Sequence, residues 1–176
     1  MAADNPAPAT FGTESARPLW APWRMSFIAG PKADGCFLCE KGTEAAAANL
    51  ENLVVARGRT AYVLLNAFPY NSGHLLVAPY RHVPGLEDLT PEERAELMDL
   101  AVRAQEAMRR AMRPDGFNFG FNLGAAAGAG IPGHIHGHLV PRWIGDTNFM
   151  PVLGNTRVVP QALEETAELL RRHWTA

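Results

Sequence analysis

The 176-residue sequence lacks long apolar runs and has no excess of charge of one sign. A membrane-spanning helix needs about 18 or more apolar residues in succession, so none is expected. With 16 basic and 18 acidic side chains the formal net charge is −2, which argues against nucleic-acid binding through a basic surface. Residues 1–10 also lack the basic and apolar segments of a signal peptide. We therefore expect a cytoplasmic protein that binds neither membranes nor nucleic acid.

The composition is typical of one folded domain. Apolar residues make up 47% of the chain and charged residues 19%, which is enough apolar material to bury a core. A chain of this length corresponds to about one domain. We expect residues 1–16 to form a disordered N-terminal tail and residues 17–176 to form a single domain.

Alternating and helical apolar patterns predict an α+β fold. Strands are predicted at residues 53–57, 61–66, 74–79, 117–123 and 134–140. Short turns join the first three strands, so these should be antiparallel neighbours. Thr90, Pro91 and Glu93 are typical of a capped helix start, and they predict a helix to about residue 113. With a last helix at about 160–174, we expect an antiparallel sheet of about five strands with flanking helices.

Cysteine is scarce, and both cysteines lie in the segment Cys36-Phe37-Leu38-Cys39. A chain without an export signal is not expected to depend on a disulfide. The motif alone leaves three interpretations open. It can be a redox dithiol, half of a zinc site that needs two further ligands, or a pair of small buried apolar side chains.

Three of the six histidines alternate in the segment His134-Ile135-His136-Gly137-His138. Alternate side chains of a strand share one face. A strand rises about 3.3–3.4 Å per residue, so His134 and His138 would be about 13 Å apart along it. Zinc–nitrogen bonds are about 2.0–2.1 Å long, so one metal ion cannot bind all three imidazoles on a regular strand. The histidines must therefore have different roles.

A loop of glycine and alanine, residues 124–133, precedes these histidines. Backbone N–H groups of such a loop can bind phosphate oxygens. Imidazole can act as nucleophile, acid or base near neutral pH. A histidine beside a phosphate-binding loop therefore indicates transfer of a phosphorus group through a covalent histidine intermediate.

The segment from His134 to Val140 resembles the His-φ-His-φ-His-φ-φ signature of the histidine triad superfamily of nucleotide hydrolases and transferases. The resemblance covers about residues 50–145. Residues 141–150 resemble the bacterial branch near the dinucleoside-polyphosphate hydrolases and diadenosine tetraphosphate phosphorylases. The family has a bulky apolar residue where Gly137 stands, so we expect the strand to lose packing there. The resemblance implies an enzyme that forms a homodimer, and we expect no organic cofactor.

The resemblance also implies roles for individual residues. His136 would be the nucleophile that attacks the α-phosphorus, His138 would bind phosphate oxygens or the leaving group, and His74 would belong to the same imidazole network. The residues expected to bind the nucleotide are Asn66 at the ribose hydroxyls, Asn122 at the phosphate site, and Gly128 and Gly130 in the glycine-rich loop.

Many bacterial members of the superfamily carry a structural zinc ion. Its ligands are a Cys-x-x-Cys pair, the first histidine of the triad and a histidine eight residues after a Gly-His pair. The corresponding residues here are Cys36, Cys39, His134 and His82. The resemblance therefore implies a closed, four-ligand structural zinc site.

Hydrolysis of dinucleoside polyphosphates, through a nucleotidyl-histidine intermediate, is the expected function. The alternatives are a diadenosine tetraphosphate phosphorylase, a nucleoside phosphoramidate hydrolase and a non-catalytic nucleotide-binding module. Phosphoramidases of the family tend to have an acidic residue where Asn66 stands, and the intact triad argues against a non-catalytic module. Phosphorolysis needs donors for a second anion. The glycine-rich loop has no Ser, Thr, Lys or Arg, which leaves Arg142 and residues 146–148 and favours hydrolysis.

Overall fold

The computed structural model describes residues 35–43, 53–146 and 162–175. The tail predicted at residues 1–16 lies outside them. The elements in chain order are α2 (Phe37–Gly42), β1 (Val54–Arg57), β2 (Ala61–Leu65), β3 (Leu75–Pro79), α3 (Pro91–Met112), β4 (Gly116–Phe121), the 3₁₀ turn η3 (Ala125–Ala127), β5 (Gly137–Arg142) and α5 (Leu163–His173). None of the helices in these segments is long and apolar enough to cross a membrane.

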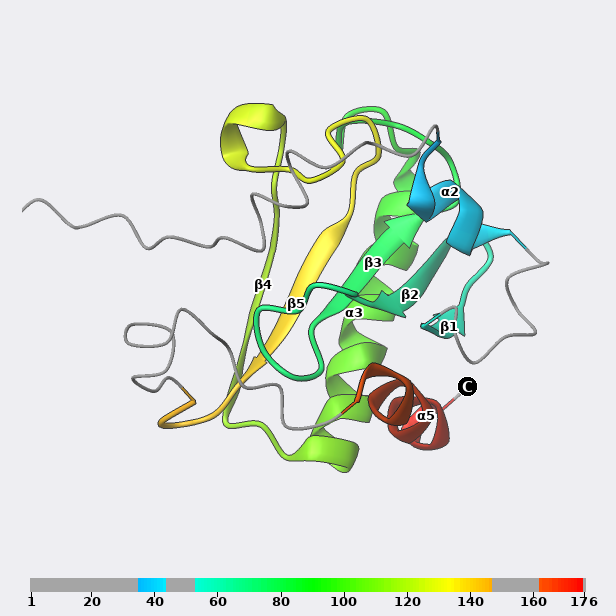
Figure 1. Ribbon diagram of the computed structural model, residues 1–176. Coiled ribbons are helices and arrows are strands. Elements are labelled where there is room, and N and C mark those ends of the chain that lie inside the picture. The colour runs from blue at the N-terminus through cyan, green and yellow to red at the C-terminus, as the bar shows by residue number, and fades with distance from the viewer. Residues whose placement is uncertain (1–34, 44–52, 147–161, 176) are drawn as a thin grey trace, which may run out of the picture.

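The five strands form one antiparallel sheet in the order β1-β2-β3-β5-β4 (Figure 1). The first three strands are consecutive neighbours, as the short turns predicted. After α3 the chain returns as β4 at the far edge, and β5 then enters between β4 and β3. In this position Leu76 of β3 lies opposite His138 of β5. The predicted α+β fold with about five antiparallel strands is confirmed.

The central strands are buried on both faces of the sheet. Ala61, Val63 and Leu65 of β2 pack in the core that includes α3 and α5. Tyr62 and Leu64 alternate with them and pack on the other face, against Leu38 of α2. Figure 1 shows α3 behind the sheet and α5 near β1. Leu76 of β3 packs on the same face as Tyr62 and Leu64. Residues directly opposite each other on neighbouring strands point to the same face, so His138, opposite Leu76, faces away from α3.

The predicted start of α3 is confirmed in its hydrogen bonds. The Thr90 side chain accepts from the Glu93 N–H, and the Glu93 carboxylate accepts from the Thr90 N–H, which makes a reciprocal capping box. Arg81 donates two hydrogen bonds of 2.7 Å to the same carboxylate. The Arg81 guanidinium lowers the pKa of Glu93 to about 2, so Glu93 is an anion at neutral pH.

The strand predicted at 134–140 begins three residues later than expected, at Gly137. The preceding backbone is held by other contacts. The His134 N–H donates to the Ile131 carbonyl oxygen at 3.2 Å, and the Ile135 N–H donates to the Val83 carbonyl oxygen at 2.7 Å. The expectation that three histidines alternate along one regular strand is therefore wrong, because His134 and His136 both precede β5 and only His138 lies within it. The position of His134 is set by the loop after β3, which turns its side chain to a separate site.

Gly137 does not leave the packing gap that the sequence suggested. A Cβ atom at this buried position would lie 3.1–3.2 Å from the rings of Phe119 and Phe121. These rings belong to the neighbouring strand β4 and pack edge to face, with centroids 5.6 Å apart. The phenylalanines of β4 therefore occupy the space that a bulky residue on β5 would fill.

A Gly137→Val substitution should lower stability because its side chain competes with these rings. Overpacking costs about 1–3 kcal/mol, more than the roughly 0.5–1 kcal/mol gained by removing a glycine from a strand. We expect a lower midpoint in urea denaturation followed by circular dichroism. Gly116→Ala on β4 is the matched control, because a Cβ at Gly116 meets nothing within 4 Å. A valine variant as stable as this control would contradict the packing argument.

Candidate active site and metal site

Two histidines from neighbouring strands form the centre of the site. His74, just before β3, and His138 of β5 lie with Nε2 and Nδ1 3.0 Å apart. The Tyr70 N–H donates to His74 Nδ1 at 3.1 Å, so this nitrogen is the acceptor and the proton of His74 is on Nε2. His74 Nε2–H then donates to His138 Nδ1. As a result, His138 carries its own proton on Nε2.

Two asparagines contact this imidazole pair. The Asn122 side-chain amide lies 3.3 Å from His138 Nε2. The atom placed at this distance is the amide nitrogen. Because Nε2 carries a proton, the amide accepts from it only after a 180° flip that exchanges its nitrogen and oxygen. The Asn66 amide nitrogen lies 3.2 Å from His74 Nδ1, and its oxygen accepts from the Phe68 N–H at 2.9 Å. Asn66, which the resemblance assigns to ribose, thus also holds His74.

His136 has the opposite protonation pattern. Its Nδ1 lies 2.8 Å from the backbone oxygen of His134, an acceptor only, so the proton is on Nδ1 and the lone pair on Nε2. Within the described segments, no group hydrogen-bonds to Nε2. The residue is 7% exposed, and burial lowers the pKa of the imidazole, partly offset by the His134 carbonyl. His136 is therefore neutral at neutral pH.

The rings of His136 and His138 lie side by side, with centroids 4.9 Å apart in a T-shaped arrangement. One ring presents a nitrogen lone pair and the other presents an N–H group. Such a pair can combine nucleophilic attack with proton donation. All three histidines predicted as catalytic, His74, His136 and His138, are brought together with Asn66 and Asn122.

The glycine-rich loop precedes this site and contains the turn η3. Gly124 and Gly128 have φ angles of 78° and 81°, which explains glycine at these positions. The Gly128 N–H donates to the Ala125 carbonyl oxygen at 3.0 Å. Gly130 is exposed in the same loop. A phosphate contact through the Gly128 N–H would therefore compete with a bond inside the loop.

Arg142, the predicted donor for a second anion, is engaged elsewhere. Its Nε and Nη2 donate to the Asp146 carboxylate at 2.6 and 2.9 Å, and its Nη1 donates to Asn118 at 2.9 Å. The Arg142 guanidinium lowers the pKa of Asp146 to about 2. Its charge is thus balanced within the protein. The other candidates, residues 147 and 148, lie outside the described residues.

Sequence reasoning missed the contact between Asn71 and Asp146. The Asn71 side-chain amide donates to Asp146 at 2.9 Å and to the Pro141 carbonyl oxygen at 3.2 Å. Asn71 belongs to the turn that carries Tyr70. The only signal in the sequence was the turn chemistry of Asn71-Ser72-Gly73, which says nothing about a partner 75 residues away.

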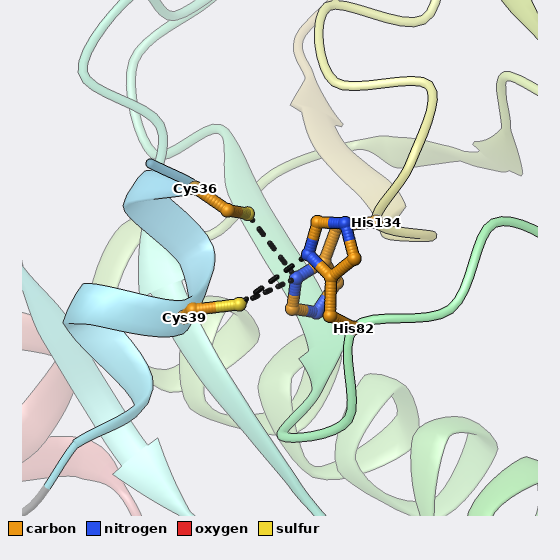
Figure 2. A group of neighbouring side chains, drawn as sticks. All are labelled: Cys36, Cys39, His82 and His134. Atoms are coloured by element: carbon orange, nitrogen blue, oxygen red, sulfur yellow. Dashed lines mark hydrogen bonds between the residues drawn. The ribbon is translucent and has the colours of Figure 1, made fainter. Parts of the chain in front are cut away.

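A second cluster lies at the end of β3 (Figure 2). Cys36 and Cys39 come from the start of α2, His82 from the loop after β3, and His134 from the segment before β5. Their ligand atoms all lie within 4.8 Å of one another, so the four side chains could hold a metal ion. This is the set that the resemblance predicted, and the structure brings all four together.

The geometry of the cluster suits a tetrahedral ion. The Sγ–Nδ1 distances are 3.3 Å for Cys36–His134, 3.4 Å for Cys39–His82 and 3.5 Å for Cys39–His134. Zinc bonds of about 2.3 Å to sulfur and 2.0–2.1 Å to nitrogen at the tetrahedral angle place these atoms about 3.6 Å apart. His134 Nε2–H donates to the Pro79 carbonyl oxygen at 2.9 Å, which leaves Nδ1 to bind the ion.

The buried Tyr62 helps to hold the cysteine helix. Its hydroxyl donates to the Leu38 carbonyl oxygen at 2.5 Å, between the two cysteines in the sequence. Burial raises the pKa of Tyr62, and the nearby cysteines raise it further, so the phenol stays protonated as a donor. The sheet thus fixes one half of the cluster and the loops before β5 and after β3 fix the other.

The antiparallel sheet and its histidine network define the histidine triad class of proteins. The family model for the HIT domain matches residues 47–143, so the chain belongs to the HIT family. A Mycobacterium tuberculosis protein named AP-4-A phosphorylase is 45% identical over 162 residues, which cover 89% of this chain and 83% of that protein. The expectation of a HIT-family enzyme is confirmed.

Solved structures support the same family. A Zn-bound histidine triad family protein from Mycobacterium smegmatis is 28% identical, with a TM-score of 0.64 and coverage of 79% of this chain and 92% of that one. A diadenosine triphosphate hydrolase from Plasmodium falciparum is 23% identical, with a TM-score of 0.55 and coverage of 69% of this chain and 75% of that one. This second likeness shows the fold alone.

Proposed function

We propose that the protein cleaves dinucleoside polyphosphates through a nucleotidyl intermediate on His136. The observation that carries this proposal is the complementary protonation of two adjacent imidazoles. Nε2 of His136 is an unprotonated, neutral nucleophile, and Nε2 of His138 carries a proton. The relative named AP-4-A phosphorylase supports this class of substrate.

In the first step the His136 Nε2 lone pair forms a bond to the α-phosphorus of the bound dinucleotide. The bond between this phosphorus and the bridging oxygen breaks, and the polyphosphate leaves as a nucleotide. His138 Nε2–H donates a hydrogen bond or its proton to the departing oxygen. In this proposal Asn66, next to His74, binds the ribose, and Asn122 binds a phosphate oxygen.

In the second step an acceptor attacks the phosphorus, and the His136 nitrogen leaves. Inorganic phosphate as acceptor gives ADP and ATP from diadenosine tetraphosphate, whereas water gives AMP and ATP. The sequence favoured water because donors for a second anion were scarce, and Arg142 is engaged by Asp146. The 45% identity to a protein named as a phosphorylase favours phosphate. We therefore propose phosphorolysis, with hydrolysis as the competing outcome.

We further propose that the metal bound by Cys36, Cys39, His82 and His134 is zinc and that it is structural. Two thiolates and two imidazoles are a preferred zinc ligand set, and four protein ligands leave no position for a reacting water. The histidine triad family protein from Mycobacterium smegmatis, described as Zn-bound, supports this assignment.

His136→Ala should lower kcat for diadenosine tetraphosphate by about 10³-fold or more, because no covalent intermediate can form. The dissociation constant for a nucleotide should change little, since binding uses other residues. The measurements are initial rates and calorimetric titration with AMP. His173→Ala, a histidine at the end of α5, is the control and should keep full activity. An alanine variant at 136 that retains more than a few per cent of activity would refute this role.

Labelled inorganic phosphate distinguishes the two acceptors. We expect the label to enter ADP at the rate of total cleavage, and the His136→Ala variant to incorporate none. The products are separated by ion-exchange chromatography. Formation of AMP and ATP without incorporation would overturn the choice of phosphate as acceptor and leave the intermediate on His136 intact.

About one zinc ion should co-purify with each chain, and its removal should lower the melting temperature. We expect a decrease of more than about 5 °C, since each 1 kcal/mol corresponds to about 2–4 °C in a domain of this size. Elemental analysis and thermal denaturation with EDTA provide the measurements, with zinc-saturated EDTA as the control. A Cys36→Ser variant of unchanged melting temperature would be evidence against the site.

A further inference from the structure

Asp146 connects the end of β5 to the turn before β3. Its carboxylate accepts hydrogen bonds from Arg142, from the Trp143 N–H at 3.2 Å and from the Asn71 side-chain amide at 2.9 Å. Its side chain is only 9% exposed. Of these three donors, Asn71 is the one that belongs to a different part of the chain.

Asn71 is held on both its side chain and its backbone. Its side-chain oxygen accepts from the Ser72 N–H at 3.2 Å, and its backbone carbonyl accepts from the His74 N–H at 3.1 Å. The side-chain amide is fixed by Asp146 and by the Pro141 carbonyl oxygen. Bonds within the turn and bonds to the end of β5 together therefore fix the position of Asn71.

Tyr70, next to Asn71, is the residue through which this turn reaches the active site. Its N–H donates to His74 Nδ1, and its ring stacks on the His74 ring with centroids 4.7 Å apart. We propose that Asp146 is a positioning residue, which fixes Asn71 so that the Tyr70 N–H keeps the proton of His74 on Nε2.

The position of that proton decides which group His138 offers. With the His74 proton on Nε2, His138 accepts at Nδ1 and presents Nε2–H. If the His74 proton moved to Nδ1, His138 would donate from Nδ1 and its Nε2 would carry a lone pair instead. The neutral His138 would then have no proton for a leaving group. Asn66 also donates to His74 Nδ1, so loss of the Tyr70 contact shifts this balance only in part.

The test uses ¹⁵N-resolved histidine NMR, which distinguishes the two neutral tautomers of His74 without any substrate. We expect wild type to show His74 protonated on Nε2, and Asp146→Ala to show a mixture of tautomers. Asp146→Asn keeps an oxygen for Asn71 and should restore most of the wild-type signal. Glu93→Gln removes a comparable buried carboxylate from the Arg81 pair and should leave His74 unchanged.

Asn71→Ala removes the same Asn71–Asp146 hydrogen bond through its donor. It also provides a second variant if Asp146→Ala does not fold. It should shift the His74 tautomer as Asp146→Ala does, and the double substitution should add nothing, because both remove one contact. An unchanged His74 tautomer in a folded Asn71→Ala or Asp146→Ala variant would overturn the proposal. A tautomer shift of similar size in Glu93→Gln would show that Asp146 acts only through the overall stability of the protein. That result would also overturn the proposal.

The kinetic consequence rests on the proposed function. Asp146→Ala should lower kcat about tenfold for diadenosine tetraphosphate and change KM less than twofold, because a proton donor is impaired and substrate contacts remain. A wild-type protein inactive on this substrate would count against the proposed function and leave the NMR result to decide the positioning role. A tautomer shift with unchanged kcat would overturn the catalytic part of the inference.

Discussion

The antiparallel pairing of β3 with β5 is the contact on which the candidate active site depends. Leu76 opposite His138 sets the register, and this register brings His74, just before β3, to a distance of 3.0 Å between its Nε2 and Nδ1 of His138. A shift of one residue would turn His138 toward α3, because side chains alternate between the faces of a sheet. The buried side chains on both faces of β3 make such a shift costly. The hydrophobic core therefore fixes the relation between two imidazoles that are 64 residues apart in the sequence.

Much of the fold was predictable because its signals are local. The turns between β1, β2 and β3, the capping box at Thr90 and the alternation along β2 each depend on a few neighbouring residues. The start of β5 was not predictable in the same way. Nothing within the segment from His134 to His136 shows that the Val83 carbonyl oxygen will take the Ile135 N–H, so the pattern of alternating histidines predicted a longer strand.

In the candidate site, too, some features were predictable from the sequence and others depend on contacts between distant residues. Residue types and spacing pointed to the imidazoles, and the family resemblance added the asparagines and the four candidate metal ligands. They did not give the partners of these groups, and the partners decide their chemistry. Opposite protonation of His136 and His138 follows from a backbone carbonyl in one case and from the Tyr70 N–H in the other. The engagement of Arg142 by Asp146, which removes a predicted anion donor, likewise appears only in three dimensions.

His134 serves the protein through two chemically separate parts. Its ring belongs to the candidate metal cluster, whereas its backbone oxygen accepts the Nδ1–H of His136. Every amino acid carries that oxygen, so a substitution at position 134 removes a candidate metal ligand without removing the acceptor of the His136 Nδ1–H. The hydrogen bond that leaves the lone pair of His136 on Nε2 therefore does not depend on which side chain stands at position 134.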